Sequence, residues 1–387
     1  MMEKLFAVCA PGLEPFTAWE LDQLSLMGSH SPAEGSPGEK WPGEDFGGVE
    51  FRGSLYDVYR TNLHLRTVSR VLVRLGEFYA SGFPELRRKA GRLPWENHLV
   101  PERAIAFRAT CQKSRLYHEG AVAERLAGAI ADRLGKPPVI RKYHEKAETD
   151  LPQLIVVRLV SNLCTISIDS SGALLHKRGY RLATGKAPLR ETLASGMVMA
   201  SRWNTLSPLL DPFCGSGTIP IEAALLARKV PPGERRRFAF MDWPHFDLEA
   251  WDKLLADARK GVVSATPKIT ASDRDAGAIE AAQANAERAG VADCIEFSCR
   301  PISAIEPPPG PGWVVTNPPY GVRLSKTRDL RNLYAQFGKV LRTRCPGWSV
   351  TLLCESLQLV RSTGLTCEQG ISIANGGLKR KLMRCRV

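Results

Sequence analysis

The sequence lacks the features that mark several classes of protein. No run of about 18 apolar residues occurs, so we expect no membrane-spanning helix. The apolar stretch from Met1 to Pro11 is too short for a signal peptide, and Glu14 and Glu20 follow it closely, so we expect a cytoplasmic protein. A length of 387 residues, with 44% hydrophobic and 24% charged residues, is typical of a globular chain of two or three domains.

Cysteine is present without any pattern of metal or disulfide motifs. The ten cysteines include no Cys-x-x-Cys pair, and no His or Cys pair has zinc-finger spacing. We therefore expect no metal, and we expect the thiols to be reduced and mostly buried. Cys214 lies within a motif described below, where packing is a better expectation than a nucleophilic role.

Positive charge is in excess, but it is not evenly spread. The net charge is +13, made up of −7 over residues 1–50, +11 over 51–182 and +9 over 183–387. A basic excess over most of the chain favours a polyanionic partner, most simply a nucleic acid. A solvated, arginine-rich surface explains the charge equally well.

Residues 1–170 show a mixed pattern of strands and helices, which predicts an α+β region. Strands are expected at 5–9, 49–53, 69–78, 104–109, 154–159 and 164–170, and helices at 14–27, 55–66, 83–90 and 119–134. The stretch 29–47 is dense in Gly, Pro, Ser and Glu, and we interpret it as a flexible insertion.

Residues 171–387 alternate between strand and helix patterns, which predicts a mostly parallel sheet with helices on both faces. Ligands of such sheets bind beyond the carboxyl ends of the strands. Strands are expected at 207–211, 268–273, 294–298, 312–316 and 348–353, and helices at 189–203, 217–228, 276–289 and 328–343.

A glycine turn joins the first of these strands to its helix, in the string Asp211 to Thr218 (DPFCGSGT). Gly215 and Gly217 let the backbone approach a ligand, and the helix N-terminus that follows favours an anionic group. A nicotinamide or flavin fingerprint needs a third glycine where Pro220 stands, and no Gly-Lys-Ser/Thr string makes a P-loop. The full string is similar to the loop of class I methyltransferases that holds the methionine end of S-adenosylmethionine (SAM).

Two further strand ends carry polar residues. Asp273 ends the strand 268–273, where a carboxylate can accept both ribose hydroxyls of a nucleoside cofactor. Asn317-Pro318-Pro319-Tyr320 follows the strand 312–316. The Asn317 side-chain oxygen and the Pro318 carbonyl can accept two hydrogen bonds from an NH₂ group, and Tyr320 can stack on a planar base. This arrangement is suited to methylation of an exocyclic amine.

Together these strings resemble the bacterial RNA guanine-N2 methyltransferases that carry a THUMP domain, of the RlmL type that modifies 23S ribosomal RNA. The resemblance covers nearly the whole chain except 29–47. It rests on 175–181 (LHKRGYR), 187–194 (APLRETLA), 211–218, 272–275, 317–321, 10–14 (APGLE), 61–66 (TNLHLR) and 114–118 (SRLYH).

The resemblance implies a Rossmann-like class I SAM methyltransferase domain over 171–387. An α+β region over 1–170 would precede it, with a ferredoxin-like part and an RNA-binding THUMP domain over about 55–168. SAM would be the cofactor and RNA the partner. The implied catalytic residues are Asn317, Pro318 and Tyr320; the implied cofactor residues are Thr192, Asp211, Phe213, Gly215, Gly217, Thr218, Asp273, Arg274 and Asn317; the implied RNA contacts are Lys113, Arg115, Arg141 and Lys142.

Two departures from the family pattern and several alternatives remain. Arg300-Pro301-Ile302 occupies the stretch where relatives place an acidic residue that helps hold adenine, and we expect no second methyltransferase after Val387, unlike in the fused enzymes. Transfer RNA is the alternative to ribosomal RNA. Asn-Pro-Pro-Tyr also serves enzymes that methylate glutamine amides or DNA adenine, and a catalytically silent RNA-binding factor is a further alternative.

Overall fold

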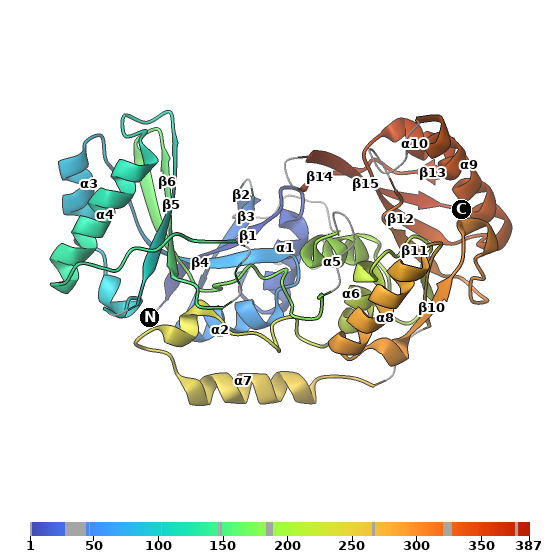
Figure 1. The fold of residues 1–387 in the computed structure, drawn as a ribbon, viewed down its shortest axis with the longest axis horizontal. Coiled ribbons are helices and arrows are strands. Elements are labelled where there is room, and N and C mark those ends of the chain that lie inside the picture. Colours follow the sequence, from blue (N-terminus) through green and yellow to red (C-terminus); the bar gives the residue numbers. More distant parts are fainter. Residues whose placement is uncertain are drawn as a thin grey trace.

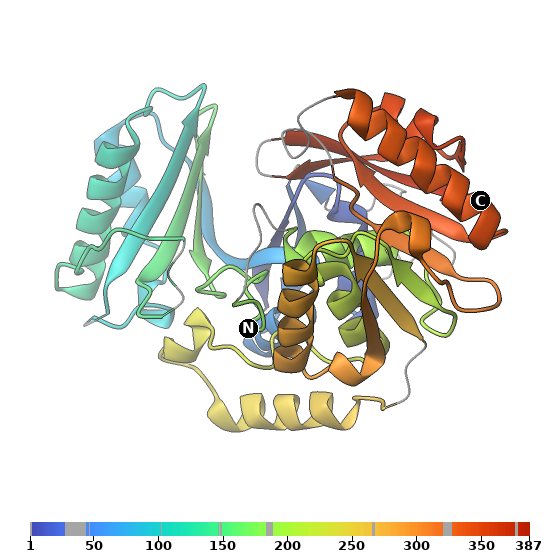
Figure 2. The ribbon, with the colours of Figure 1, turned by 45° about the vertical axis from the view of Figure 1, so that its right-hand side comes forward.

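The computed structural model describes residues 2–27, 44–45, 47–101, 103–145, 147, 149–182, 189–264, 268–319, 327–375 and 378–387. Two lobes, each built on one sheet, lie side by side and are joined across the middle of the molecule (Figure 1, Figure 2). The first sheet belongs to the α+β region and the second to the alternating half, so the fold class that the sequence predicts is confirmed. Most of 29–47 lies outside the described residues.

The N-terminal lobe is a seven-stranded sheet in the order β2-β3-β1-β4-β7-β6-β5. Its long strand β4 runs through both halves of this sheet and pairs with β1 on one side and β7 on the other (Figure 1). The elements are β1 (Glu3–Cys9), α1 (Glu14–Gln23), β2 (Glu44–Asp45), β3 (Gly48–Gly53), α2 (Leu55–His64), β4 (Val68–Tyr79), α3 (Phe83–Ala90), β5 (Ile105–Gln112), α4 (Glu119–Leu134), β6 (Gln153–Val160) and β7 (Leu163–Asp169), with a short 3-10 turn at Trp95–Asn97.

The C-terminal lobe is an eight-stranded sheet whose order is β10-β9-β8-β11-β12-β15-β13, with β14 paired to β15. The strands from β10 to β12 are parallel, as the alternation predicts, and β15 is antiparallel. The elements are α5 (Glu191–Ala200), β8 (Leu209–Asp211), α6 (Thr218–Ala227), α7 (Leu248–Lys260), β9 (Ile269–Asp273), α8 (Ala276–Ala289), β10 (Ile295–Cys299), β11 (Trp313–Thr316), α9 (Thr327–Arg344), β12 (Ser349–Cys354), α10 (Leu357–Ser362), β13 (Thr366–Cys367), β14 (Ile371–Asn375) and β15 (Leu378–Arg386), with 3-10 turns at Ala239–Asp242, Ala292–Cys294 and Ile302–Ala304.

The antiparallel edge corrects the expectation that the thiols are reduced. Cys367 on β13 and Cys385 on β15 are directly opposite in the register and form a disulfide. The sequence did not predict these strands, because residues 366–386 carry none of the motifs that located the parallel strands. Of the eight other cysteines, all but Cys111 and Cys299 are buried, as expected.

Each lobe contributes a segment to the core of the other. Each core therefore contains residues from both sides of the boundary expected at 170/171. Phe16 of α1 and Leu13, which directly precedes this helix, pack with α5 and α6 in the C-terminal core. In return, residues 238–254, which lie between α6 and β9 in the chain, pack in the N-terminal core. There Trp251 of α7 meets the ring of Tyr59 at 6.3 Å between centroids, and Phe238 and Phe240 stack beside them. Helix α7 passes beneath α2 (Figure 1), and the sequence did not predict it.

This exchange predicts a large stability loss from one substitution in α7. Trp251 is 6% exposed, so Trp251→Ala leaves a cavity between the lobes and should lower the free energy of unfolding by about 3–5 kcal/mol. Leu248, on the same helix, is 61% exposed, and Leu248→Ala should change it by less than about 0.5 kcal/mol. Urea unfolding of both variants measures this; similar losses in the two would contradict the exchange of segments.

Candidate cofactor and amine site

Three of the predicted motifs meet at the carboxyl edge of the parallel sheet. β8 lies between β9 and β11, so the segments that follow these three strands are neighbours. From β8 the chain continues to β9 and β10 on one side, and it then returns to β11 and β12 on the other side of β8. This reversal makes the edge at β8 the switch point where open α/β sheets bind ligands. The sequence therefore placed Asp211, Asp273 and Asn317 in one site.

The two glycines of the loop serve different purposes. Gly215 has φ +53°, and a Cβ built there would meet no described atom within 4 Å, so its backbone faces open space. Gly217 has φ +83°, and its Cβ would lie 2.9 Å from the Cβ of Ala282. Gly215 thus leaves room for a ligand, whereas Gly217 lets the start of α6 pack closely against α8.

Asp211 joins two strands beneath this loop. It is buried, and its Oδ1 accepts hydrogen bonds from the Phe213 amide at 3.2 Å and the Thr316 hydroxyl at 2.6 Å. Its Oδ2 is also buried and accepts no hydrogen bond from the described residues. Burial raises the pKa of Asp211 to about 7, and the negative charge of Asp273 contributes.

Asp273 holds the loop from the neighbouring strand. Its Oδ2 accepts a hydrogen bond from the Gly215 amide at 3.0 Å, and its Oδ1 accepts one from the Asp275 amide at 3.1 Å. Asp275 caps α8 through the amides of Gly277 and Ala278. Asp273 is partly exposed and Arg274 fully so, which leaves the outer lone pairs of Asp273 free to accept hydroxyl groups.

Asn317 follows β11 on the other side of β8. Its Oδ1 is buried and has no hydrogen-bond partner among the described residues, and Pro318 is buried beside it. A buried carbonyl oxygen without a donor is costly, so such an atom points to a donor that arrives with a ligand. Tyr320 lies outside the described residues.

Beside the loop, Arg181 and Glu191 form a contact that motif reasoning missed. Thr192 and Thr218, both predicted as cofactor residues, are buried at the starts of α5 and α6. Arg181 lies between them: its Nε is 3.2 Å from Glu191 Oε1, and its Nη2 donates to the Thr218 hydroxyl at 2.8 Å. Burial raises the pKa of Glu191 to about 7. The strings 175–181 and 187–194 contained both residues, but gave no sign that they would pair.

Two other residues of the loop have packing roles. The Cys214 thiol is buried, and its pKa is raised well above the ordinary value by burial and by the nearby Asp211 and Asp273 carboxylates. It is therefore unsuited to nucleophilic catalysis, as the sequence analysis expected. Phe213 packs edge-on against Phe337 of α9, with 5.5 Å between ring centroids.

The four predicted RNA contacts do not form one cluster. Lys113 and Arg115 follow the end of β5, whereas the Arg141 amide bonds the Ile105 carbonyl at the start of β5. The two pairs are thus separated by the length of an eight-residue strand, roughly 25 Å. All four are exposed, and Arg141 forms an ion pair with Asp150 at 2.9 Å.

Arg300, at the position where an acid was expected, is also paired. Its guanidinium lies 2.5 Å from a carboxylate oxygen of Glu306. Within the described residues no group of three or more His, Cys, Asp or Glu side chains is arranged to hold a metal ion. Among the same residues, no helix has both the length and the apolar character that crossing a membrane requires.

Comparison with known families agrees with this site. Residues 178–381 match the RMKL-like methyltransferase domain, and residues 43–72 match the RlmL ferredoxin-like domain. The chain belongs to this methyltransferase family. It is 33% identical over 384 residues to a Synechocystis protein provisionally named as an RNA methyltransferase, covering 98% of this chain and 95% of that protein.

Other relatives are longer or have a solved structure. The ribosomal RNA large subunit methyltransferase K/L of Syntrophotalea carbinolica is 32% identical over 98% of this chain, which spans about half (53%) of that relative. The crystal structure of SMU.472, a provisionally assigned methyltransferase complexed with SAH, superposes with a TM-score of 0.85 at 27% identity, covering 99% of this chain and 97% of that one.

The site residues fit a SAM molecule. The open space over Gly215 and the N-terminus of α6 would accommodate the methionine end, and the partly exposed Asp273 carboxylate would accept the ribose hydroxyls. The partnerless oxygens of Asp211 and Asn317 are acceptors that a ligand can satisfy.

We predict that Asp273→Ala weakens SAM binding by about 1–3 kcal/mol, because charge-assisted hydrogen bonds are lost. Asp275→Ala, on the same turn, removes only a helix cap and should leave SAM affinity nearly unchanged. Isothermal titration calorimetry measures both. Equal affinities of Asp273→Ala and the wild type would remove Asp273 from the site.

The raised pKa of Asp211 predicts a pH dependence of stability. The unfolded carboxyl titrates near its ordinary value of 3.8 and the folded one near 7, so the folded protein holds an extra proton between these values. The contribution of Asp211 to stability is therefore largest below about pH 4 and is lost as the pH rises to about 7. Asp211→Asn cannot titrate, so its stability should rise relative to the wild type over this window.

Urea unfolding of the two proteins at several pH values tests this, because Glu191 titrates alike in both and cancels from the difference. A pH-independent difference between Asp211→Asn and the wild type would show that this carboxyl does not have a raised pKa in the folded protein.

Proposed function

We propose that the protein transfers a methyl group from SAM to the exocyclic N2 of a guanine in RNA, with 23S ribosomal RNA as the first candidate. The observation that carries the proposal is the buried Oδ1 of Asn317 beside Pro318, which has no hydrogen-bond partner among the described residues and lies at the same sheet edge as the SAM loop. Membership of the methyltransferase family and the RNA substrates named for its relatives support it.

The chemistry follows from where the acceptors lie. The lone pair of a guanine amine is delocalised into the ring, so the amine is a weak nucleophile. Asn317 Oδ1 and the Pro318 carbonyl accept its two N–H groups, orient the lone pair and stabilise the positive charge that develops on nitrogen as the N–C bond forms. SAM would supply the methyl group: its S–CH₃ bond would break as the N–C bond forms, S-adenosylhomocysteine would leave, and the cationic nitrogen would then lose a proton. Tyr320 would stack on the base once it is turned out of its helix.

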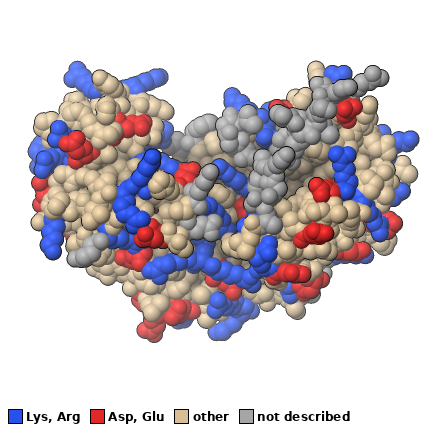
Figure 3. Space-filling model, in the orientation of Figure 1, with Lys and Arg blue, Asp and Glu red and all other residues tan. Residues whose placement is uncertain are grey.

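The N-terminal lobe is proposed to hold folded RNA through phosphates and shape, as a THUMP-containing region. Its two pairs of candidate contacts, at opposite ends of β5, suit an extended RNA helix better than a single phosphate. The space-filling view is hollowed between the lobes at its upper edge, and Lys and Arg side chains lie across the middle of this face (Figure 3).

Asn317→Ala tests the mechanism. It should lower the single-turnover rate of methyl transfer to RNA by roughly 10²–10³, because the acceptor gains strength as the amine becomes cationic. SAM affinity should stay nearly unchanged. Asn317→Asp keeps an acceptor in place and should retain partial activity. A wild-type chemical rate in Asn317→Ala would show that this loop is not the reaction centre.

The substrate is tested by mass-spectrometric mapping of modified nucleosides in RNA from cells with and without the gene. The proposal expects an N2-methylguanosine in 23S ribosomal RNA that disappears with the gene. Loss from transfer RNA would correct the substrate, and loss of a methyladenosine, or of no modified nucleoside, would overturn guanine N2 as the target.

A further inference from the structure

Helix α6 connects the cofactor loop to the seam between the lobes. It begins at Thr218, directly after Gly217, and ends at Ala227 against the N-terminal lobe. Helices are stiff over ten residues, so whatever holds the far end and the middle of α6 also sets the position of the loop at its start.

The start and the middle of α6 are held by the segment 178–181. Arg181 donates to the Thr218 hydroxyl, as described above. In the middle, Glu222 is fully buried: Arg178 Nε lies 2.9 Å from its Oε1, and the Tyr180 hydroxyl donates to the same oxygen at 2.9 Å. The Ser195 hydroxyl of α5 donates to Oε2 at 2.6 Å. The string 178–181 (RGYR) thus binds α6 through the side chains of three of its four residues.

The end of α6 is held by Arg66, which belongs to the N-terminal lobe. Its Nη2 donates to the carbonyl of Val230 at 2.6 Å, just beyond the end of α6, and to that of Leu225 at 3.3 Å, in the last turn, which also accepts from the Val230 amide. A guanidinium at this place complements the negative end of the helix dipole. Arg66 is fixed in turn, because its amide donates to Glu20 and its carbonyl accepts from Arg178.

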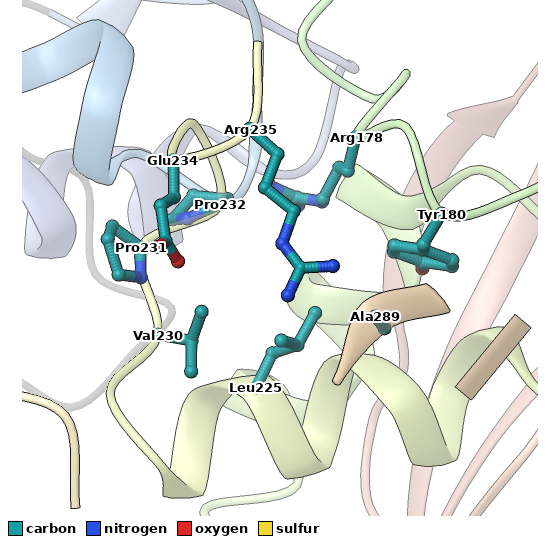
Figure 4. A pocket seen from close by; sticks show the side chains of 9 residues that line it. All are labelled: Arg178, Tyr180, Leu225, Val230, Pro231, Pro232, Glu234, Arg235 and Ala289. Carbon is teal, nitrogen blue, oxygen red and sulfur yellow. The ribbon is translucent and has the colours of Figure 1, made fainter. Parts of the chain in front are cut away.

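The surroundings of this contact leave little freedom. Gly233, just beyond Val230, donates to the Leu63 carbonyl at 3.0 Å, and a Cβ there would lie 2.7 Å from the Asn62 carbonyl. Figure 4 shows Arg178, Tyr180, Leu225 and Val230 around a pocket at the end of α6. Its volume is about 30 Å³, which is room for water rather than for an organic ligand.

We infer that Arg66 is a positioning residue for the cofactor loop, acting through the C-terminal end of α6. The N-terminal lobe is then a structural part of the SAM site as well as the proposed RNA grip. The inference rests on the proposed function, because it concerns SAM binding.

The matched control is Arg70, four residues away on β4. Its guanidinium is equally buried, but it pairs with Asp169, donates to the Gly172 carbonyl at 2.8 Å and to Tyr143 at 2.6 Å, and has no hydrogen bond to α6. Arg70→Leu strands the Asp169 carboxylate, so it should destabilise the protein at least as much as Arg66→Leu.

In the full-length protein, Arg66→Leu should raise the KM and calorimetric Kd for SAM about tenfold, with kcat at saturating SAM and RNA affinity within about twofold. Arg66→Lys keeps the charge but reaches one carbonyl, and should raise both about threefold. Arg70→Leu should leave the Kd for SAM within about twofold of the wild type.

Amide hydrogen exchange of the wild type provides a test that needs no variant. The amides of α6 should exchange with the same opening free energy as those of β4, since Arg66 joins the two. Opening of α6 together with α8 and independently of β4 would overturn the inference. So would an unchanged Kd for SAM in Arg66→Leu or an equal rise in Arg70→Leu. Failure of the wild type to bind SAM would instead overturn the proposed function.

Discussion

The buried ion pair between Arg178 and Glu222 is the interaction on which the arrangement of the two lobes depends. Their side chains are 2% and 0% exposed, so both charges have lost their hydration. Such a pair contributes little net stability, but removal of one partner is expensive. What it supplies is geometry: Glu222 is paired with Arg178 and accepts hydrogen bonds from Tyr180 and Ser195, and Arg178 donates to the Arg66 carbonyl. The pair itself lies within the C-terminal lobe, and it links the lobes because it holds Arg178 where it donates to the Arg66 carbonyl, a bond that another docking would lose.

Arginines at the seam between the lobes account for part of the excess of positive charge. The guanidinium of Arg236 donates to the carbonyls of Leu174 and Lys177, and that of Arg288 donates to the Tyr180 carbonyl. Arginine suits this use because its donors are fixed in a plane and its charge is weakly hydrated. Part of the excess of positive charge therefore holds the chain together at the lobe junction, and only the remainder is available to a polyanion. Net charge alone could not separate the two uses.

Local patterns predicted most of the fold and the centre of the site. The bounds of α4 and α8 follow directly from their caps and apolar faces, and the three strand-end motifs meet because parallel strands place their carboxyl ends on one edge. Long-range features were out of reach. The disulfide depends on the register of two edge strands, and the place of α7 depends on Tyr59, nearly 190 residues earlier. The pairing of Arg181 with Glu191 likewise needed the packing of α5 on α6. Composition and periodicity do not encode such contacts.

The cofactor edge holds several buried acceptors that no described donor satisfies. They are Asp211 Oδ2, Glu191 Oε2 and Asn317 Oδ1, and burial raises the pKa of the two carboxyl groups to about 7, so each is about half protonated near pH 7. Each such atom costs stability, and a site that must meet a cationic or amine-bearing ligand needs acceptors that are not already used. The cost can be carried because both carboxylate oxygens of Glu222, only a few residues away on α6, have partners. The bonded middle of α6, at Glu222, thus holds the helix in place, while the buried acceptors near its start remain available to a ligand.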